Sequence, residues 1–153
     1  MPQIPENFRD SNYELVPYDG SAVSWRVSLY GVCIIDEQLL LIKHKDEKFY
    51  DVPGGGIEMD ETLEQALERE SIEEAGWSLK TIRPILVKTD WFYHTEEARF
   101  YKSLQIYFEA TGKQKLAAPT DQRIRFVELV PLKRLAEYEL YPNLREAVEL
   151  LDR

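Results

Sequence analysis

The stretch that decides the fold is PGGGIEMDETLEQALERESIEEAGW, residues 53–77, in which a glycine-rich turn runs into a segment with helical spacing. Residues 62–75 predict a helix, because apolar side chains recur three and four positions apart along them. At about 100° per residue these side chains share one face, and they are Leu63, Ala66 and Leu67. The segment therefore predicts a helix with one buried stripe.

Three glutamates break the usual division of a helix into an apolar buried face and a charged solvent face. Glu70 and Glu74 lie within about 20° of Leu63 around the helix axis, and Glu73 lies about one residue's turn to the side. Acids on a solvated face would instead lie opposite the stripe, as Glu64 does. We therefore expect the three acids to point toward whatever the helix packs against.

The same acids occupy an electrostatically unfavourable end of the helix. Gly76 is expected to end it, because glycine adopts the left-handed conformation at little steric cost. The helix dipole disfavours a carboxylate in the last turn by a few tenths to about 1 kcal/mol. Arg69 alone cannot neutralise three converging acids. The expected compensation is a bound divalent cation with oxygen ligands, Mg²⁺ or Mn²⁺.

Length and charge limit the architecture and the partners. With 153 residues and 44% hydrophobic content, the chain fits a single compact domain. Its formal net charge of -9 repels nucleic-acid backbones, so we expect no long nucleic acid as a partner. A small phosphorylated ligand held through a metal is compatible with this charge.

Cysteine content and hydropathy predict a cytoplasmic protein. The single cysteine, Cys33, lies in an apolar run and is expected to pack as a small hydrophobic residue, which favours a reducing compartment. We see neither a leader-like segment nor an apolar run of about 18 residues, so no membrane contact is expected.

The remaining elements predict an α/β fold, an α+β sandwich with a mixed β-sheet, one central helix and one C-terminal helix. Residues 1–23 predict an N-terminal extension, in which Tyr13 and Leu15 add an edge strand, and residues 24–153 a single domain. Strands are expected at 25–35, 39–44, 49–52, 78–89 (broken at Pro84), 100–110 and 124–130. Loops are expected at 90–99 and 112–122, a short helix at 131–135, and a longer helix from Pro142.

The central stretch resembles the signature of the Nudix hydrolases, G-x5-E-x7-R-E-U-x-E-E-x-G-U, where U is a bulky apolar residue. Gly55 and Glu61 fit the first part, and residues 69–77 fit the second. Two positions depart from the common pattern: Ser71 stands at a U position, and Asp60 stands where many members have glycine. The resemblance covers roughly residues 24–150.

This resemblance implies the Nudix fold and metal-dependent hydrolysis of a diphosphate linked to a further group, X. Diphosphate cleavage needs cations that bridge phosphate oxygens and a carboxylate that takes a proton from the attacking water. The implied metal ligands are Glu70, Glu73, Glu74 and a backbone carbonyl of Gly54 or Gly55. The implied catalytic residues are Glu73 as general base, with Arg69 and Glu61 orienting the acids. Some members use a later glutamate as the base, which leaves Glu96, Glu97, Glu109 and Glu128 open.

The remaining candidates concern substrate binding. Lys43 and Lys45 alternate with Leu41 on a predicted strand, where they either contact phosphate or face solvent. Trp91 and Tyr93 fall in the predicted loop 90–99, where they either stack on a nucleobase or pack onto the domain. His44 and His94 are too few for a zinc site unless carboxylates join them.

The sequence therefore predicts a Mg²⁺- or Mn²⁺-dependent pyrophosphohydrolase acting on a small nucleoside-diphosphate-X substrate, such as a nucleoside triphosphate or a nucleotide sugar. One alternative is a dinucleoside polyphosphate hydrolase, since Tyr93 follows the signature at the spacing noted in such members. Another is a non-catalytic nucleotide-binding module of the same fold. Family members often form homodimers, so a homodimer is also expected.

Overall fold

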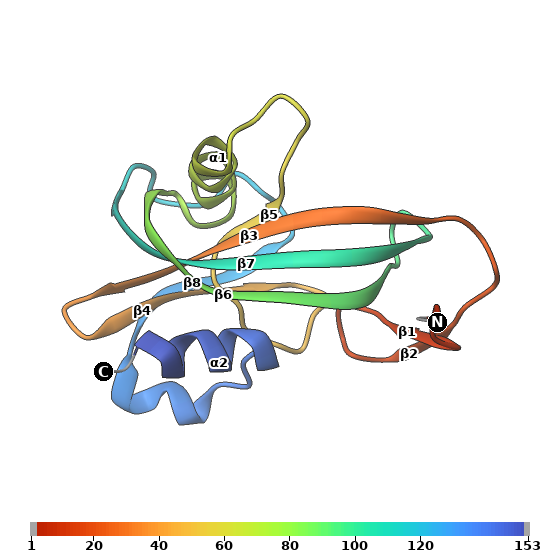
Figure 1. Cartoon of the computed structure of the whole chain (residues 1–153). Helices are drawn as coiled ribbons and strands as arrows, with labels where there is room; N and C mark the ends of the chain where they lie inside the picture. The colour runs from red at the N-terminus through yellow and green to blue at the C-terminus, as the bar shows by residue number, and fades with distance from the viewer. Residues whose placement is uncertain (1–2, 152–153) are drawn as a thin grey trace.

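A mixed β-sheet separates two helices in the computed structural model, which describes residues 3–151 (Figure 1). Helix α1 lies on one side of the sheet and helix α2 on the other. The elements in chain order are β1 (Asn7–Arg9), β2 (Leu15–Pro17), β3 (Val23–Ile35), β4 (Gln38–His44), β5 (Gly54–Gly56), α1 (Leu63–Ala75), β6 (Trp77–His94), β7 (Arg99–Gln114), β8 (Ile124–Pro131), the 3₁₀ helix η1 (Leu132–Glu137) and α2 (Pro142–Leu151).

The sheet has the strand order β2-β1-β6-β7-β3-β4-β8, and β5 pairs with β3 beside this path. The pairs β3/β7 and β1/β6 are parallel, whereas β3/β4, β4/β8, β3/β5 and β6/β7 are antiparallel. The predicted mixed sheet with a central and a C-terminal helix is therefore confirmed. No described helix has the length and apolar content that crossing a membrane requires.

Each face of the sheet has its own hydrophobic core. On the α1 side, Ala66 and Leu67 of the predicted stripe are fully buried against Leu29 and Cys33, so the expected packing of the cysteine is confirmed. On the α2 side, Leu144 and Ala147 pack against alternate strand residues, among them Val32, Leu39, Leu41 and Val130. Alternation along β3 and β4 thus supplies both cores from the same strands.

Both ends of α1 are capped, the C-terminal end by the glycine that the sequence indicates. Thr62 accepts a hydrogen bond from the backbone of Gln65, whose side chain bonds back in a capping box. Gly76 adopts a left-handed φ of 72° and ends the helix. Ser71, at the usually apolar position, is buried and accepts a hydrogen bond from the backbone N–H of Leu79. The serine thus bonds the helix to β6 directly.

Three local predictions were wrong. Residues 49–52 form only isolated bridges at Tyr50 and Asp51, and the strand that follows is β5. Strand β6 continues through Pro84, because irregular register on both sides of it accommodates a residue without an N–H. The loop expected at 90–99 is restricted to 95–98, since β6 and β7 pair as far as His94 and Arg99.

The N-terminal segment packs onto the ends of the long strands, away from the helices (Figure 1). Leu15 lies in the edge strand β2 as predicted, whereas Tyr13 lies in the turn before it. Phe8 of β1 is fully buried, with its ring centroid 4.7 Å from that of Phe100 and 5.5 Å from that of Trp91. The two strands of this segment, β1 and β2, are therefore part of the packed sheet.

Candidate metal and phosphate site

The glycine turn lies directly against the acidic end of α1. A Cβ atom at Gly55 would lie 2.8 Å from the carboxylate carbon of Glu70, and one at Gly54 would lie 2.1 Å from the carbonyl oxygen of Leu29. Side chains at these two positions would clash, so the close approach of backbone and carboxylate depends on glycine.

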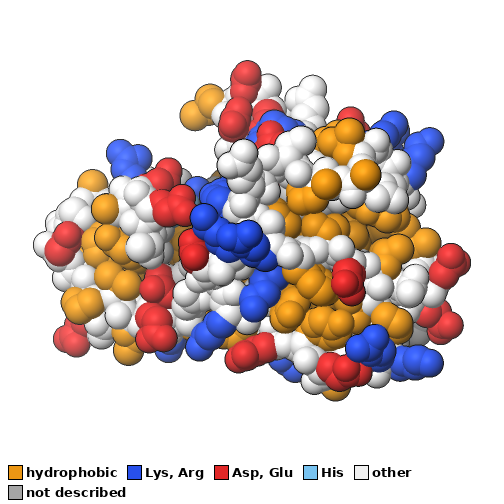
Figure 2. All heavy atoms as spheres, turned by 180° about the vertical axis from the view of Figure 1, so that it is seen from behind, with side chains coloured by type: hydrophobic (Ala, Val, Ile, Leu, Met, Phe, Trp, Pro, Cys, Tyr) orange, Lys and Arg blue, Asp and Glu red, His pale blue; other side chains and the backbone are white. Residues whose placement is uncertain are grey.

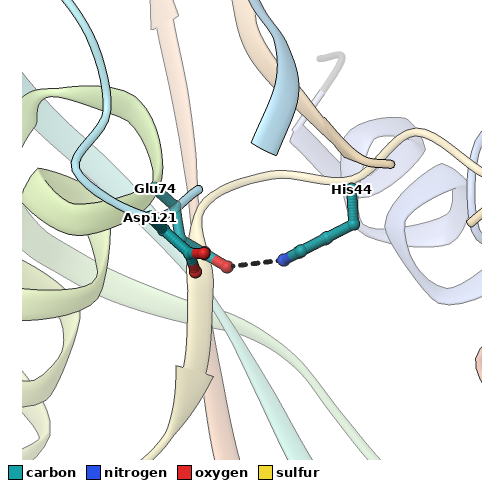
Figure 3. Close-up of side chains that lie close together, drawn as sticks. All are labelled: His44, Glu74 and Asp121. Carbon is teal, nitrogen blue, oxygen red and sulfur yellow. Dashed lines mark hydrogen bonds and ion pairs between the residues drawn. The ribbon is translucent and has the colours of Figure 1, made fainter. Parts of the chain in front are cut away.

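Glu74 is the most buried of the three acids, with 3% of its surface exposed. Its Oε1 accepts a hydrogen bond of 2.9 Å from the backbone N–H of Gly54, and its Oε2 lies 2.9 Å from Nε2 of His44. Asp121 approaches the same carboxylate from the loop before β8 (Figure 3). One ligand atom from each of these three residues lies within 4.8 Å of the others.

His44 and Glu74 form a coupled pair at the edge of the site. Burial favours a neutral imidazole, but the carboxylates of Glu47 and Glu74 outweigh it and raise the pKa of His44 to about 10. Burial also raises the pKa of Glu74, against the opposing effects of His44 and the Gly54 N–H. The Nδ1 atom of His44 lies 3.3 Å from Glu47 but is not aligned for a hydrogen bond.

Arg69 is shared among three carboxylates. Its Nε and Nη2 donate to the two oxygens of Glu61, at 2.6 and 2.9 Å, and its Nη1 lies 2.9 Å from Glu70 and 3.5 Å from Glu73. These bonds hold the pKa of Glu61 down to about 2. The structure therefore brings Arg69 and Glu61 together, and the arginine charge is largely matched by Glu61.

Glu70 has less compensation than Glu61. Burial, followed by the charge of Glu74, raises the pKa of Glu70 to about 7, despite the contact with Arg69. The expectation that all three acids point toward the sheet was wrong for Glu73, whose side chain is 45% exposed at the helix surface. A glycine cradle with one buried carboxylate, Glu74, one partly buried carboxylate, Glu70, and a shared arginine suits a hard divalent cation, whose ligands are carboxylate and carbonyl oxygens.

A cavity of about 210 Å³ opens beside these acids and is lined by Gly54, Gly55, Gly56, Glu70 and Glu74; we call it the catalytic cavity. Aromatic side chains from the two ends and the middle of the chain form much of the remaining wall, and they are Tyr13, Tyr30, Phe92, Tyr107 and Tyr141. The cations on the wall are Arg9, Arg26 and Arg123. Acid, aromatic and cationic groups are thus combined in one enclosure.

Arg26 is a second cation beside the glycine turn, where Arg69 also donates to the carbonyl of Gly56 at 3.3 Å. A Cβ atom at Gly56 would lie 3.4 Å from the guanidinium carbon of Arg26, which also lies 5.7 Å from the ring centroid of Tyr101. Despite the net negative charge of the chain, Lys and Arg side chains gather in the hollow between the two lobes seen from behind (Figure 2). A planar guanidinium here can bind a phosphate group in two-point contact.

The residues predicted to bind substrate lie elsewhere. Lys43 places its Nζ 5.1 Å from the ring centroid of Tyr50, and Lys45 is exposed on a neighbouring cavity. Tyr93 packs on Phe100, with ring centroids 4.8 Å apart, and Trp91 lies beneath Lys102, whose Nζ is 4.0 Å from its ring centroid. None of these four residues is among the described residues that line the catalytic cavity.

The four glutamates that were left open as the general base do not line the catalytic cavity, unlike Glu70 and Glu74. Glu96 is exposed and 3.9 Å from Arg123, and Glu97 accepts a hydrogen bond from Tyr101. Glu109 pairs with Arg83, and Glu128 is exposed on β8. Among the described residues that line the catalytic cavity, these four do not appear.

Three residues at the site were missed by the sequence analysis. Arg26 alternates with Ser28 and Tyr30 on β3, so a polar face on an otherwise apolar strand was the available signal. His44 was considered only as a zinc ligand. Asp121 lies in a polar loop, and no local pattern predicted that its backbone N–H would bond the carbonyl of Glu73.

The chain is similar to known proteins in the region that contains this site. The sequence model of the NUDIX domain matches residues 25–151. A Bacillus subtilis protein named "Putative 8-oxo-dGTP diphosphatase" is 33% identical over 85 residues, which cover 56% of this chain and 53% of that protein. An RNA pyrophosphohydrolase of Sodalis glossinidius is 37% identical over 60 residues, 39% of this chain and 34% of that protein. The chain thus spans about half or less of these relatives.

Solved structures show the same fold at low identity. A NUDIX hydrolase from Nitrosomonas europaea superposes with a TM-score of 0.67 and 18% identity, over 83% of this chain and 88% of that one.

Proposed function

Because the chain belongs to the NUDIX domain family over residues 25–151, we propose that it is a metal-dependent hydrolase that cleaves the diphosphate linkage of a small nucleoside-diphosphate-X substrate. One observation carries this proposal: the carboxylates of Glu70 and Glu74 converge on the glycine turn inside a cavity, and Arg69 is already bound to Glu61. Four carboxylates gather here, those of Glu61, Glu70, Glu73 and Glu74, whereas Arg69 and His44 supply only two positive charges. A bound divalent cation would offset the remaining negative charge.

Glu70 and Glu74, with Glu73 at the rim and a backbone carbonyl of Gly54 or Gly55, would hold Mg²⁺ or Mn²⁺. When bound, the cation neutralises charge on the phosphate oxygens and makes water easier to deprotonate. The fit rests on the glycine cradle, since any Cβ at Gly55 would occupy the space that the Glu70 carboxylate now fills. Oxygen ligands of this kind match Mg²⁺ and Mn²⁺.

The chain's own residues have separate tasks in this reaction. Arg26 binds a phosphate group beside the turn, and Arg69, held by Glu61, fixes the direction of the Glu70 carboxylate. Glu73 accepts the proton of the attacking water, because its carboxylate is accessible to water and lies 3.5 Å from Arg69, beside the other acids. Asp121 is the second acid placed near Glu74. Comparing Glu73→Gln with Asp121→Asn identifies which of them takes the proton.

The aromatic wall supports a nucleotide substrate. Phe92 and Tyr13 provide ring faces on which a base can stack, and the amides of Gln105 and Asn143, bonded to each other at 2.8 Å, add donors and acceptors. The name of one curated relative, "Putative 8-oxo-dGTP diphosphatase", agrees with this class, whereas the name "RNA pyrophosphohydrolase" gives RNA as the substrate of the other. Tyr93, which motivated the dinucleoside polyphosphate alternative, lies outside this wall.

A panel assay tests the proposal. Nucleoside triphosphates, nucleotide sugars, ADP-ribose and dinucleoside polyphosphates are incubated with the protein and Mg²⁺ or Mn²⁺, and phosphate is measured after a coupled phosphatase. We expect metal-dependent turnover of at least one class, abolished by EDTA. Nucleotide binding without turnover of any of them would favour the non-catalytic binding module instead.

A further inference from the structure

The turn between β1 and β2 forms part of the wall of the catalytic cavity, and we call its residues 10–13 the strap. The strap precedes the matched family region, which begins at residue 25. The side chain of Asn12 bonds the domain twice, donating to the carbonyl of Asp46 at 3.0 Å and accepting from the N–H of Lys48 at 2.9 Å. A segment outside the matched region is thus fastened to the loop that follows β4.

The strap is also held from within and by Tyr141, the residue that precedes α2. The Oδ1 atom of Asp10 accepts the backbone N–H groups of Asn12 and Glu14, at 2.8 and 3.0 Å, which fixes the turn. The hydroxyl of Tyr141 donates to the carbonyl of Ser11. The ring of Tyr13 lies 5.4 Å from that of Phe49. These contacts make the strap a fixed wall.

This wall stands between two cavities. Beyond the strap lies a cavity of about 310 Å³, the outer cavity, whose lining includes Asn12, Lys45 and Glu96. Residues that line both cavities include Asp10 and Ser11 of the strap, together with His44, Phe92 and Arg123. His44 and Arg123 lie beside Glu74 and Asp121, so the metal site borders the boundary between the cavities.

The space on the metal side of the strap is small. Ligand pockets commonly measure about 300–1,000 Å³, whereas the catalytic cavity has about 210 Å³. The catalytic cavity contains the aromatic wall suited to a nucleoside. His44 lines both cavities, so a bulky group that does not fit the catalytic cavity would enter the outer cavity beside His44, where strap residues form part of the lining.

Building on the function proposed above, we propose that the strap determines substrate specificity. It restricts the enzyme to nucleotides whose group X is short, such as the terminal phosphates of a nucleoside triphosphate. It excludes nucleotides in which X is a sugar or a second nucleoside. The selectivity resides in the backbone of residues 10–12, which the Asn12 side chain holds in place.

The test compares Asn12→Ala with the wild-type protein. The substitution removes both hydrogen bonds of the Asn12 side chain to the domain, and it deletes no side chain of the catalytic cavity, because Asn12 is not one of its described lining residues. The measured quantity is kcat/KM for diadenosine tetraphosphate and ADP-ribose, divided by kcat/KM for ATP and GTP. Asn7→Ala, an exposed change on the neighbouring strand β1, is the matched control.

We expect wild-type protein to prefer the triphosphates, and Asn12→Ala to raise the ratio at least about fivefold while Asn7→Ala leaves it unchanged. Amide hydrogen exchange gives a second readout, in which Asn12→Ala speeds exchange in residues 10–14. Faster exchange without a change in the ratio would overturn the proposal, as would a wild-type preference for the bulky substrates. Absence of turnover on every substrate would refute the proposed hydrolase function instead.

Discussion

The carboxylate of Glu74 accepts a hydrogen bond from the backbone N–H of Gly54 across a separation of 20 residues, at 2.9 Å. This bond joins the last turn of α1 to the glycine turn, so the acids and the backbone that they face are held as one unit. The same carboxylate meets His44 through its second oxygen. A helix end that is unfavourable for acids thereby carries a carboxylate whose two oxygens are both held in place.

Glu74→Gln should lower kcat at least about 100-fold and leave the fold intact. Glutamine keeps the shape and one oxygen that can accept the Gly54 N–H, but it lacks the charge that a divalent cation requires. Steady-state kinetics and circular dichroism measure the two effects. Glu64→Gln, on the exposed side of the same helix, should retain wild-type rates. A near-normal kcat in Glu74→Gln would remove Glu74 from the site.

Gly55→Ala should weaken Mn²⁺ binding by about 10-fold or more, since the new Cβ atom would displace the Glu70 carboxylate from its present position. Titration calorimetry with Mn²⁺ measures the change. A double-mutant cycle with Glu70→Gln supplies the control, because a change that acts through Glu70 adds little once that carboxylate is gone. Fully additive losses would show that the glycine acts independently of Glu70.

The metal-free protein should lose stability as pH rises from about 4.5 toward about 7. Burial and the neighbouring charge of Glu74 raise the pKa of Glu70 from 4.5 to about 7, so in this window the folded protein holds a proton that the unfolded chain releases. The free energy of unfolding therefore falls with rising pH. Urea unfolding in EDTA at pH 5 and pH 7.5 measures it.

The matched variants for this measurement are Glu70→Gln and Glu64→Gln. Glu70→Gln should be stabilised relative to wild type by more at pH 7.5 than at pH 5, because its side chain stays neutral at both. Glu64→Gln should show the same difference from wild type at both pH values. An equal effect of Glu70→Gln at the two pH values would contradict the raised pKa.

Phe92→Leu should raise KM about fivefold or more with little change in kcat, because stacking of a base on an aromatic ring contributes about 1–3 kcal/mol. Tyr93→Leu, the neighbouring residue on the opposite face of β6, should leave KM unchanged. Steady-state kinetics on the best substrate of the panel separates the two constants. A larger KM effect at Tyr93 than at Phe92 would reverse this assignment of the faces.

The sequence predicted those features that depend on local pattern. The 3.6-residue period identified α1, Gly76 identified its end, and the position of Glu70 and Glu74 on the buried stripe identified the inward-facing acids. The fold class followed from the same helix, the β3/β4 hairpin and the C-terminal helix. These features are set by residues a few positions apart, which a single sequence displays directly.

The remaining features depend on contacts between distant segments. Asp121 reaches Glu74 because its loop bonds the carbonyl of Glu73, and the strap reaches the catalytic cavity because Asn12 bonds Asp46 and Lys48. Residues 90–94 were predicted as a loop, but they belong to strand β6. Side chains alternate between the two faces of a strand, so Phe92 points toward the cavity and Tyr93 away from it. No periodicity within those segments encodes their partners.

The most direct test of the central claim is the anomalous scattering of manganese in crystals of the protein soaked with Mn²⁺ and a non-hydrolysable nucleotide. The account predicts an anomalous peak between the carboxylates of Glu70 and Glu74, beside the carbonyl of Gly54 or Gly55. A nucleotide bound in the catalytic cavity without manganese at Glu70, or manganese held by His44 and Asp121 alone, would contradict it.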